Sequence, residues 1–185
     1  MGQARTLTDR EFHKLIEKVG NTRHGKRNQL MLYMTHYAGF RVGELAALKV
    51  KDVLDDDARV REQVILEAHQ TKGNKGRSVF LPAKLRELLM NFLHGKHGDD
   101  FLFRSQKGDC FTANTLQSTI TRLYAQCGLT GCSSHTGRRS FLTKLASQGV
   151  SVRVLQELAG HKHIGTTQRY IDVNDEMKRA ALLLV

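Results

Sequence analysis

The sequence lacks several features that mark special classes of protein. It has no tryptophan, a single proline and three cysteines among 185 residues. No apolar run approaches the roughly 18 residues of a membrane span, and the first residues lack the apolar stretch of a signal peptide. The cysteines, Cys110, Cys127 and Cys132, are odd in number and match neither a zinc ribbon nor a disulfide framework in their spacing. We therefore expect a cytoplasmic protein with reduced thiols and no membrane partner.

Acidic residues are also scarce relative to basic ones. Lys plus Arg number 29 against 18 Asp plus Glu, which gives a net charge of +11 and a pI near 9.9. Such an excess suggests a polyanionic partner, of which nucleic acid is the commonest; a basic protein kept soluble by its charge is the alternative. The length is sufficient for one domain with its own core. We expect a single globular domain over residues 1–185.

Hydrophobic residues recur with helical periodicity along most of the chain. Thr8 and Glu11 form a T-x-x-E capping box in front of the first apolar stripe. The predicted helices contain Phe12–Val19, 28–38, 43–48, Leu85–Leu93, Leu116–Cys127, Phe141–Ala146, 151–158 and, as a last amphipathic piece, about 175–184. Helix ends are predicted at Gly39, Gly95, Gly149 and Gly160.

Two shorter segments have the alternating pattern of strands. We predict one strand over 59–69 and a second over 77–81, which Pro82 closes. Asp55–Asp57 predicts a turn before the first strand, and Gly73–Asn74 predicts a hairpin loop between the two. The expected fold class is mainly α with a small antiparallel β-sheet (α+β).

No segment predicts a metal or cofactor site. Residues 20–26 have the glycine and lysine spacing of a phosphate loop, but the Ser or Thr that must follow is missing. His161 and His163, with His135 upstream, have no carboxylate or cysteine pair at ligand spacing. The acidic triplet 55–57 is better interpreted as a solvated turn. We expect no metal and no cofactor.

Four separated segments carry side chains suited to phosphate chemistry. They are 38–45 with Arg41 and Glu44, the basic hairpin tip 71–77 with Lys72, 135–138 with His135 and Arg138, and 158–161 with His161, followed by Tyr170. Arginine side chains can neutralise charge at phosphorus without a metal. Tyrosine can act as a covalent nucleophile, and histidine or lysine can move protons. The residue types suit metal-free phosphoryl transfer, although spacing alone does not bring them together.

In this order, the four segments closely resemble the tyrosine recombinase (phage integrase) family. Its signature is an R-x-x-E box, a hairpin lysine, an H-x-x-R box and an L-x-G-H…Y box, and the resemblance runs from about Thr6 to Val173. It implies the recombinase catalytic-domain fold and site-specific DNA cleavage and rejoining through a covalent 3′-phosphotyrosine, without metal or ATP. A type IB topoisomerase and a non-catalytic DNA-binding regulator on the same scaffold are the alternatives.

The resemblance also implies a role for each motif residue. Tyr170 would attack the phosphodiester, and His135 would act on the proton of this nucleophile. Arg41 and Arg138 would hold the non-bridging oxygens, and His161 would hydrogen-bond the phosphate. Lys72 would protonate the leaving 5′-oxygen. Lys75 competes with Lys72 for the last role. Glu44 would be structural or orienting rather than catalytic.

The sequence departs from many family members beside the H-x-x-R box. Arg139 stands where a histidine is frequent and adds positive charge there. Gly137 lowers helix propensity by ~1 kcal/mol, so we expect the helix to begin near Arg138, with Ser133 or Ser134 helping to cap it.

The resemblance further implies how the chain assembles on double-stranded DNA. We expect a monomer in solution and a homotetramer on paired sites, with the segment 174–185 packed in cis or exchanged between protomers. Family members usually carry a separate N-terminal domain that clamps the opposite face of the DNA, and 185 residues leave no room for it. We therefore expect either a catalytic domain of a longer integrase or a naturally short recombinase, bacterial or phage-encoded, that binds DNA weakly alone.

Overall fold

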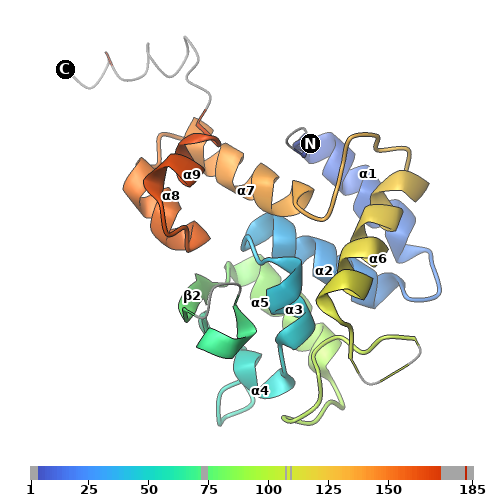
Figure 1. The fold of residues 1–185 in the computed structure, drawn as a ribbon. Coiled ribbons are helices and arrows are strands. Elements are labelled where there is room, and N and C mark those ends of the chain that lie inside the picture. The colour runs from blue at the N-terminus through green and yellow to red at the C-terminus, as the bar shows by residue number, and fades with distance from the viewer. Residues whose placement is uncertain (1–3, 72–74, 107, 109, 172–181, 183–185) are drawn as a thin grey trace.

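The computed structural model describes residues 4–71, 75–106, 108, 110–171 and 182, and this part of the chain is largely helical (Figure 1). Strands β1 (Gln63–Leu66) and β2 (Arg77–Phe80) pair antiparallel, with Val64 opposite Val79. The α-helices are α1 (Asp9–Gly20), α2 (Gly25–Tyr37), α3 (Val42–Ala47), α4 (Val50–Val53), α5 (Ala83–Leu93), α6 (Ala113–Gln126), α7 (Thr136–Ser147), α8 (Val152–Ala159) and α9 (Ile164–Gln168). The predicted fold class is confirmed.

Buried apolar side chains of the described residues form a large cluster and a smaller one. The large cluster draws on α1 to α6 and both strands. The smaller cluster consists of Leu142, Ala146, Leu155 and Ala159 from α7 and α8, with Tyr170 among the side chains packed against it. We call α7, α8 and α9 the α7–α9 lobe and the preceding elements the main body. In Figure 1 the lobe, in orange to red, lies at one end of the molecule, where α7 packs against α2.

Helices α2 and α7 approach closely at Gly137. A Cβ atom at this position would lie 2.3 Å from Oγ1 of Thr35. The expected helix start near Arg138 is wrong, because α7 already begins at Thr136, with His135 as the residue before its first turn. The backbone N–H of Ser133 donates to Oγ1 of Thr136 at 2.9 Å. The absence of a side chain at position 137 thus permits close helix packing, which outweighs its low helix propensity.

The predicted helix boundaries agree closely with the structure where a cap marks them. Thr8 and Glu11 form the expected capping box, with the Glu11 N–H donating to Oγ1 of Thr8 at 3.2 Å. The second helix starts three residues before the predicted 28, at Gly25, whose N–H donates to the carbonyl of Thr22 at 2.8 Å. The short helices α4 and α9 were not predicted. The expected hairpin loop at 73–74 and the last helix at 175–184 lie outside the described residues.

The first strand is much shorter than the predicted 59–69. After Leu66 the chain leaves the ladder and forms a 3₁₀ turn, η1 (Ala68–Gln70). The side chain of Gln70 explains the change, because its Oε1 accepts from the N–H of Glu67 at 2.9 Å and its Nε2 donates to Asp52 at 2.8 Å. A local side-chain bond of this kind competes with the strand ladder.

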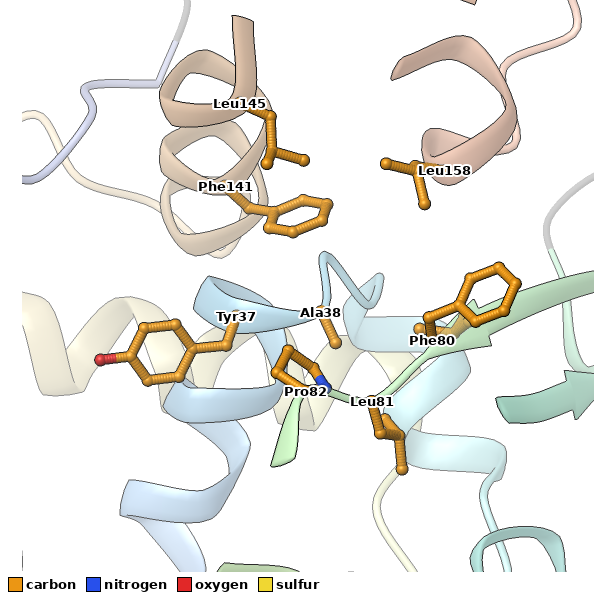
Figure 2. Close-up of a pocket in the computed structure, with 9 residues that line it drawn as sticks. Tyr37, Ala38, Phe80, Leu81, Pro82, Phe141, Leu145 and Leu158 are labelled. Atoms are coloured by element: carbon orange, nitrogen blue, oxygen red, sulfur yellow. The ribbon is translucent and has the colours of Figure 1, made fainter. Parts of the chain in front are cut away.

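An apolar hollow of about 300 Å³ lies between the α7–α9 lobe and the main body (Figure 2). Phe141 and Leu145 of α7 line it on one side, and the chain around Ala38 and Pro82 lines it on the other. Apolar contact between the two parts is therefore incomplete here, and polar contacts contribute to holding them together. Across the described ranges, no helix has both the length and the apolar character needed to cross a membrane.

Candidate active site

Arg138 lies in the first turns of α7 and is almost fully buried, with 5% of its surface exposed. Its Nη1 donates to the carbonyl of Gly39 at 2.5 Å, and its Nη2 donates to the carbonyl of Ala159 and to Nε2 of His161, the latter at 3.2 Å. Burial lowers the pKa of Arg138 to about 9, so the guanidinium stays charged at neutral pH. The side chain therefore places a buried positive charge between α2, α7 and α8.

Arg41 reaches the same place from the segment before α3. Its Nη1 donates to Oε1 of Glu44 at 2.7 Å, and its Nη2 donates to the carbonyls of Ala159 and Gly160 at 2.9 and 3.0 Å. A quarter of the Arg41 side chain is exposed, whereas the Glu44 side chain is 1% exposed. The R-x-x-E pair is thus no isolated surface ion pair, because its carboxylate belongs to the protein interior.

Arg77, the first residue of β2, is a third cation at this place that the sequence analysis did not single out. Its side chain is 7% exposed and binds both carboxylate oxygens of Glu44. Its Nη1 donates to the carbonyl of Leu158 at 2.9 Å. Burial alone would raise the pKa of Glu44, but the bonds from Arg77 and Arg41 outweigh it and lower that pKa. The only sequence signal for Arg77 was its position in the basic hairpin.

The C-terminal end of α8 faces all three arginines. The carbonyls of Leu158, Ala159 and Gly160 accept their hydrogen bonds. Carbonyls at a helix C-terminus have no intrahelical partner and carry negative partial charge, which favours cations there. Gly160 ends the helix, as predicted, in the left-handed conformation with φ of 59°, and a Cβ on it would lie 2.6 Å from Cδ of Arg77.

His161 follows this helix end and contacts the arginine group directly. Its Nε2 faces Arg138, and its Nδ1 lies 3.0 Å from Oγ1 of Thr167, a fully buried residue of α9. Burial, together with the positive charges of Arg138, Arg41 and Arg77, lowers the pKa of His161 to about 4. The imidazole is therefore neutral at pH 7.

Helix α9 returns the chain so that Tyr170 lies beside His161. The two rings stack with centroids 5.7 Å apart and an angle of 18° between their planes. The guanidinium carbon of Arg139 lies 5.8 Å from the centroid of the Tyr170 ring. Tyr170 is half-buried against the small apolar cluster of the lobe. The fold thus brings together Arg41, Arg138, His161 and Tyr170, four of the six residues that the sequence analysis nominated.

Of the remaining two nominated residues, only His135 lies in the described part of the chain. His135 precedes α7 and is exposed, with its N–H donating to Oγ of Ser133 at 3.3 Å. Lys72 lies outside the described residues. Lys75, the competitor of Lys72, is exposed, and its carbonyl accepts from Thr71 at 2.6 Å.

Among the described residues, no three His, Cys, Asp or Glu side chains gather as a metal-binding group. Cys110, Cys127 and Cys132 are free thiols.

Comparison with known proteins yields consistent matches over almost the entire chain. Residues 5–177 match the model of the phage integrase family. A tyrosine recombinase of Pseudothermotoga lettingae is 34% identical over 179 residues, which cover 95% of this chain and 59% of that protein. The crystal structure of XerA recombinase superimposes with a TM-score of 0.75 at 25% identity, covering 99% of this chain and 66% of that one. The XerH site-specific recombinase, in a post-cleavage complex with a palindromic difH substrate, gives a TM-score of 0.72 at 25% identity, covering 98% and 53%. This chain spans about 60% of the length of the curated relatives that it matches.

Proposed function

Since this chain belongs to the phage integrase family, we propose that it cleaves and rejoins DNA strands at specific sites through a covalent bond between Tyr170 and a 3′-phosphate. XerH, which shares the fold, was solved with its DNA substrate after cleavage. In the proposal DNA is the substrate, and neither ATP nor a metal takes part in the reaction.

The observation that carries the proposal is the charge of the group around Arg138. Among the described residues, three arginine side chains converge there; Arg41 and Arg77 bind the carboxylate of Glu44, whereas Arg138 donates to backbone carbonyls and has no ion pair. The neighbouring His161 is neutral, because burial and the arginines lower its pKa to about 4. The group therefore carries an excess of positive charge where the tyrosine ring also lies. A phosphodiester supplies the missing negative charge, and arginine binds its oxygens with matching geometry.

Each nominated residue has a task in the proposed reaction. Oη of Tyr170 attacks phosphorus and passes its proton to His135, while the bond to the 5′-oxygen breaks. Arg41 and Arg138 stabilise the charge that develops on the non-bridging oxygens, and His161 hydrogen-bonds the phosphate. Lys72 gives its proton to the leaving 5′-oxygen. The 5′-hydroxyl of another strand then reverses these steps and releases Tyr170, so the energy of the broken bond is retained.

Trapping of the covalent intermediate tests the proposal. The protein is incubated with nicked fragments of DNA from the genome that encodes it, so that the short cleaved strand diffuses away. Protein-linked strands are then recovered under denaturing conditions and sequenced. We expect strands joined through their 3′-ends to Tyr170, with one sequence enriched. This sequence also identifies the DNA target.

Two variants provide the matched comparison for this experiment. Tyr170→Phe should abolish the adduct while leaving binding to duplex DNA within a few-fold. Tyr33→Phe removes a hydroxyl from α2, in the main body, and should leave the adduct unchanged. A denaturant-resistant adduct in the Tyr170→Phe protein would show that another residue is the nucleophile. The absence of any adduct in the unmodified protein would favour the non-catalytic regulator.

A second assay separates recombination from topoisomerase activity. A recombinase exchanges strands between two copies of the recovered sequence, whereas a type IB enzyme relaxes a supercoiled plasmid that carries only one. We propose exchange between two sites by a tetramer formed from monomers, with the segment 174–185 contributing to assembly. Removing the residues after Val173 should therefore weaken cooperative binding to paired sites; unchanged cooperativity would exclude that role.

A further inference from the structure

Both ring nitrogens of His161 have a hydrogen-bond partner. Nε2 lies 3.2 Å from Nη2 of Arg138, and Nδ1 lies 3.0 Å from Oγ1 of Thr167. A guanidinium group donates hydrogen bonds and accepts none. Nε2 must therefore be the nitrogen that accepts, so the neutral ring carries its proton on Nδ1 and donates it to the Thr167 hydroxyl. The contacts thus select one tautomer of His161.

The backbone of His161 is fixed independently of its ring. Its N–H donates to the carbonyl of Gln156 at 3.1 Å, and its own carbonyl accepts from Nε2 of Gln156 at 3.0 Å. Arg153 donates to Oε1 of Gln156, which sets the orientation of that amide. With the backbone held on both sides, the partners of the ring decide which nitrogen faces the arginine group.

Thr167 contacts both of the stacked residues. Its side chain is fully buried and meets His161, while its carbonyl accepts from the N–H of Tyr170 at 3.0 Å. One residue of α9 therefore holds the imidazole through its side chain and the backbone of the tyrosine through its carbonyl. The hydroxyl of Thr167 is needed for this contact, because an apolar side chain of the same shape would leave Nδ1 of His161 without a hydrogen-bond partner.

We propose that Thr167 is a positioning residue that holds the His161 ring through Nδ1 in either tautomer, while the group facing Nε2 selects the tautomer. In the free protein its hydroxyl accepts the proton of Nδ1 while Arg138 donates to Nε2. A hydroxyl also donates, so the same side chain can support the opposite tautomer, in which Nε2–H donates to a phosphate oxygen. This second state rests on the proposed function, since it requires a DNA phosphate in the site. Thr167 thereby allows His161 to serve as acceptor before DNA binds and as donor afterwards.

Nitrogen NMR of the histidine rings tests the first state without any DNA. The signals of His161 are identified by their loss in a His161→Gln variant. We expect a protonated, pyrrole-type Nδ1 and an unprotonated, pyridine-type Nε2 in the unmodified protein. Thr167→Ser should preserve this pattern and the slow solvent exchange of the Nδ1 proton, whereas Thr167→Val, which keeps the Arg138 donor but removes the acceptor of Nδ1–H, should make that proton exchange faster. Thr166→Val makes the same substitution at the exposed neighbour and should leave the exchange unchanged.

Two NMR results would overturn the inference. A protonated Nε2 in the unmodified protein would do so, and that measurement does not require any variant to fold. A folded Thr167→Val protein whose Nδ1 proton exchanges with solvent as slowly as in the unmodified protein would also contradict it.

The rate of adduct formation tests the second state. On the DNA site recovered by trapping, Thr167→Val should react about tenfold more slowly, the size expected from one hydrogen bond to a neutral group. Thr167→Ser should restore most of the rate. A Thr167→Val protein that cleaves as fast as the unmodified one would remove Thr167 from the reaction. If the unmodified protein forms no adduct, the proposed function fails, and the NMR measurements alone decide the role of Thr167.

Discussion

Arg77 binds the buried carboxylate of Glu44 through two parallel hydrogen bonds, from Nε at 2.8 Å and from Nη2 at 2.7 Å. Arg41 adds a bond from its side chain and one from its backbone N–H to the same carboxylate, both at 2.7 Å. Glu44 therefore holds one arginine from the R-x-x-E box and one from the strand after the hairpin. The carboxylate orients these cations while leaving an excess of positive charge beside Tyr170.

Removal of the Glu44 carboxylate should strongly destabilise the protein. Glu44→Ala leaves the largely buried Arg77 without its counter-charge, and breaking a buried ion pair costs about 3–5 kcal/mol. Glu62→Ala breaks the exposed pair with Arg86 and should cost no more than about 1 kcal/mol. Urea unfolding of the two variants measures the difference. Equal midpoints would contradict a structural role for Glu44.

His36 should make stability depend on pH. Burial lowers its pKa to about 4, with Asp9 raising it and Lys144 and His13 lowering it further. Because an unfolded histidine titrates near 6.5, the unfolded chain takes up a proton first, and stability falls as pH decreases from about 6.5 to 4. This shift corresponds to about 3 kcal/mol.

The variant His36→Phe isolates that contribution, because it keeps a ring stacked on Phe12. The difference in unfolding free energy between pH 7 and pH 4.5 should shrink relative to the unmodified protein. His94→Phe, at an exposed position, should leave the difference unchanged. An unaltered pH dependence in His36→Phe would show that other groups cause it.

Replacement of Arg138 by lysine should slow DNA cleavage even though the charge is kept. A lysine cannot reach the carbonyls of Gly39 and Ala159 in the same fork and still face His161. By analogy with the loss of one oxyanion donor, we expect single-turnover cleavage to fall about 10²–10³-fold. Arg122→Lys, exposed on α6, is the control and should react normally. Thermal melting of both proteins verifies that a slower rate does not reflect unfolding.

Gly137→Ala should destabilise the protein despite the better helix propensity of alanine. The new Cβ would lie 2.3 Å from Thr35, and overpacking of this kind costs about 1–3 kcal/mol. Gly43→Ala in α3 is the control, because its Cβ would meet Ala113 at an ordinary 3.8 Å. Gly43→Ala should therefore be neutral or stabilising by up to about 1 kcal/mol. A stable Gly137→Ala protein would mean that α7 can move away from α2.

The features predictable from the sequence are those with a local cause. The capping box of Thr8 and Glu11 and the helix stop at Gly160 depend on neighbours within a few residues, and both are present in the structure. Helix α7 begins two residues before the predicted Arg138, and the close packing of Gly137 against Thr35 of α2 is a contact that the local sequence does not reveal. The extent of the first strand was predicted wrongly because Gln70 bonds to Asp52 on α4.

The same distinction applies to the candidate site. Arg41, Arg138, His161 and Tyr170 were nominated through the family resemblance, and the fold places them together. Arg77 and Thr167 were not singled out, because their importance arises from contacts to residues distant in sequence or from burial. An isolated arginine in a basic hairpin, or a threonine in a short helix, carries no signal of such contacts.

The three arginines that donate to the end of α8 come from both sides of the boundary between the lobe and the main body. Arg41 and Arg77 belong to the main body, whereas Arg138 and the carbonyl acceptors at 158–160 belong to the lobe. The guanidinium groups that would meet DNA thus also hold two apolar cores together. In the proposed reaction the same guanidinium groups would bind phosphate oxygens, so substitutions that redirect them toward the phosphate should weaken the attachment of the lobe. Substitutions at this boundary should therefore change DNA cleavage and the stability of the protein together.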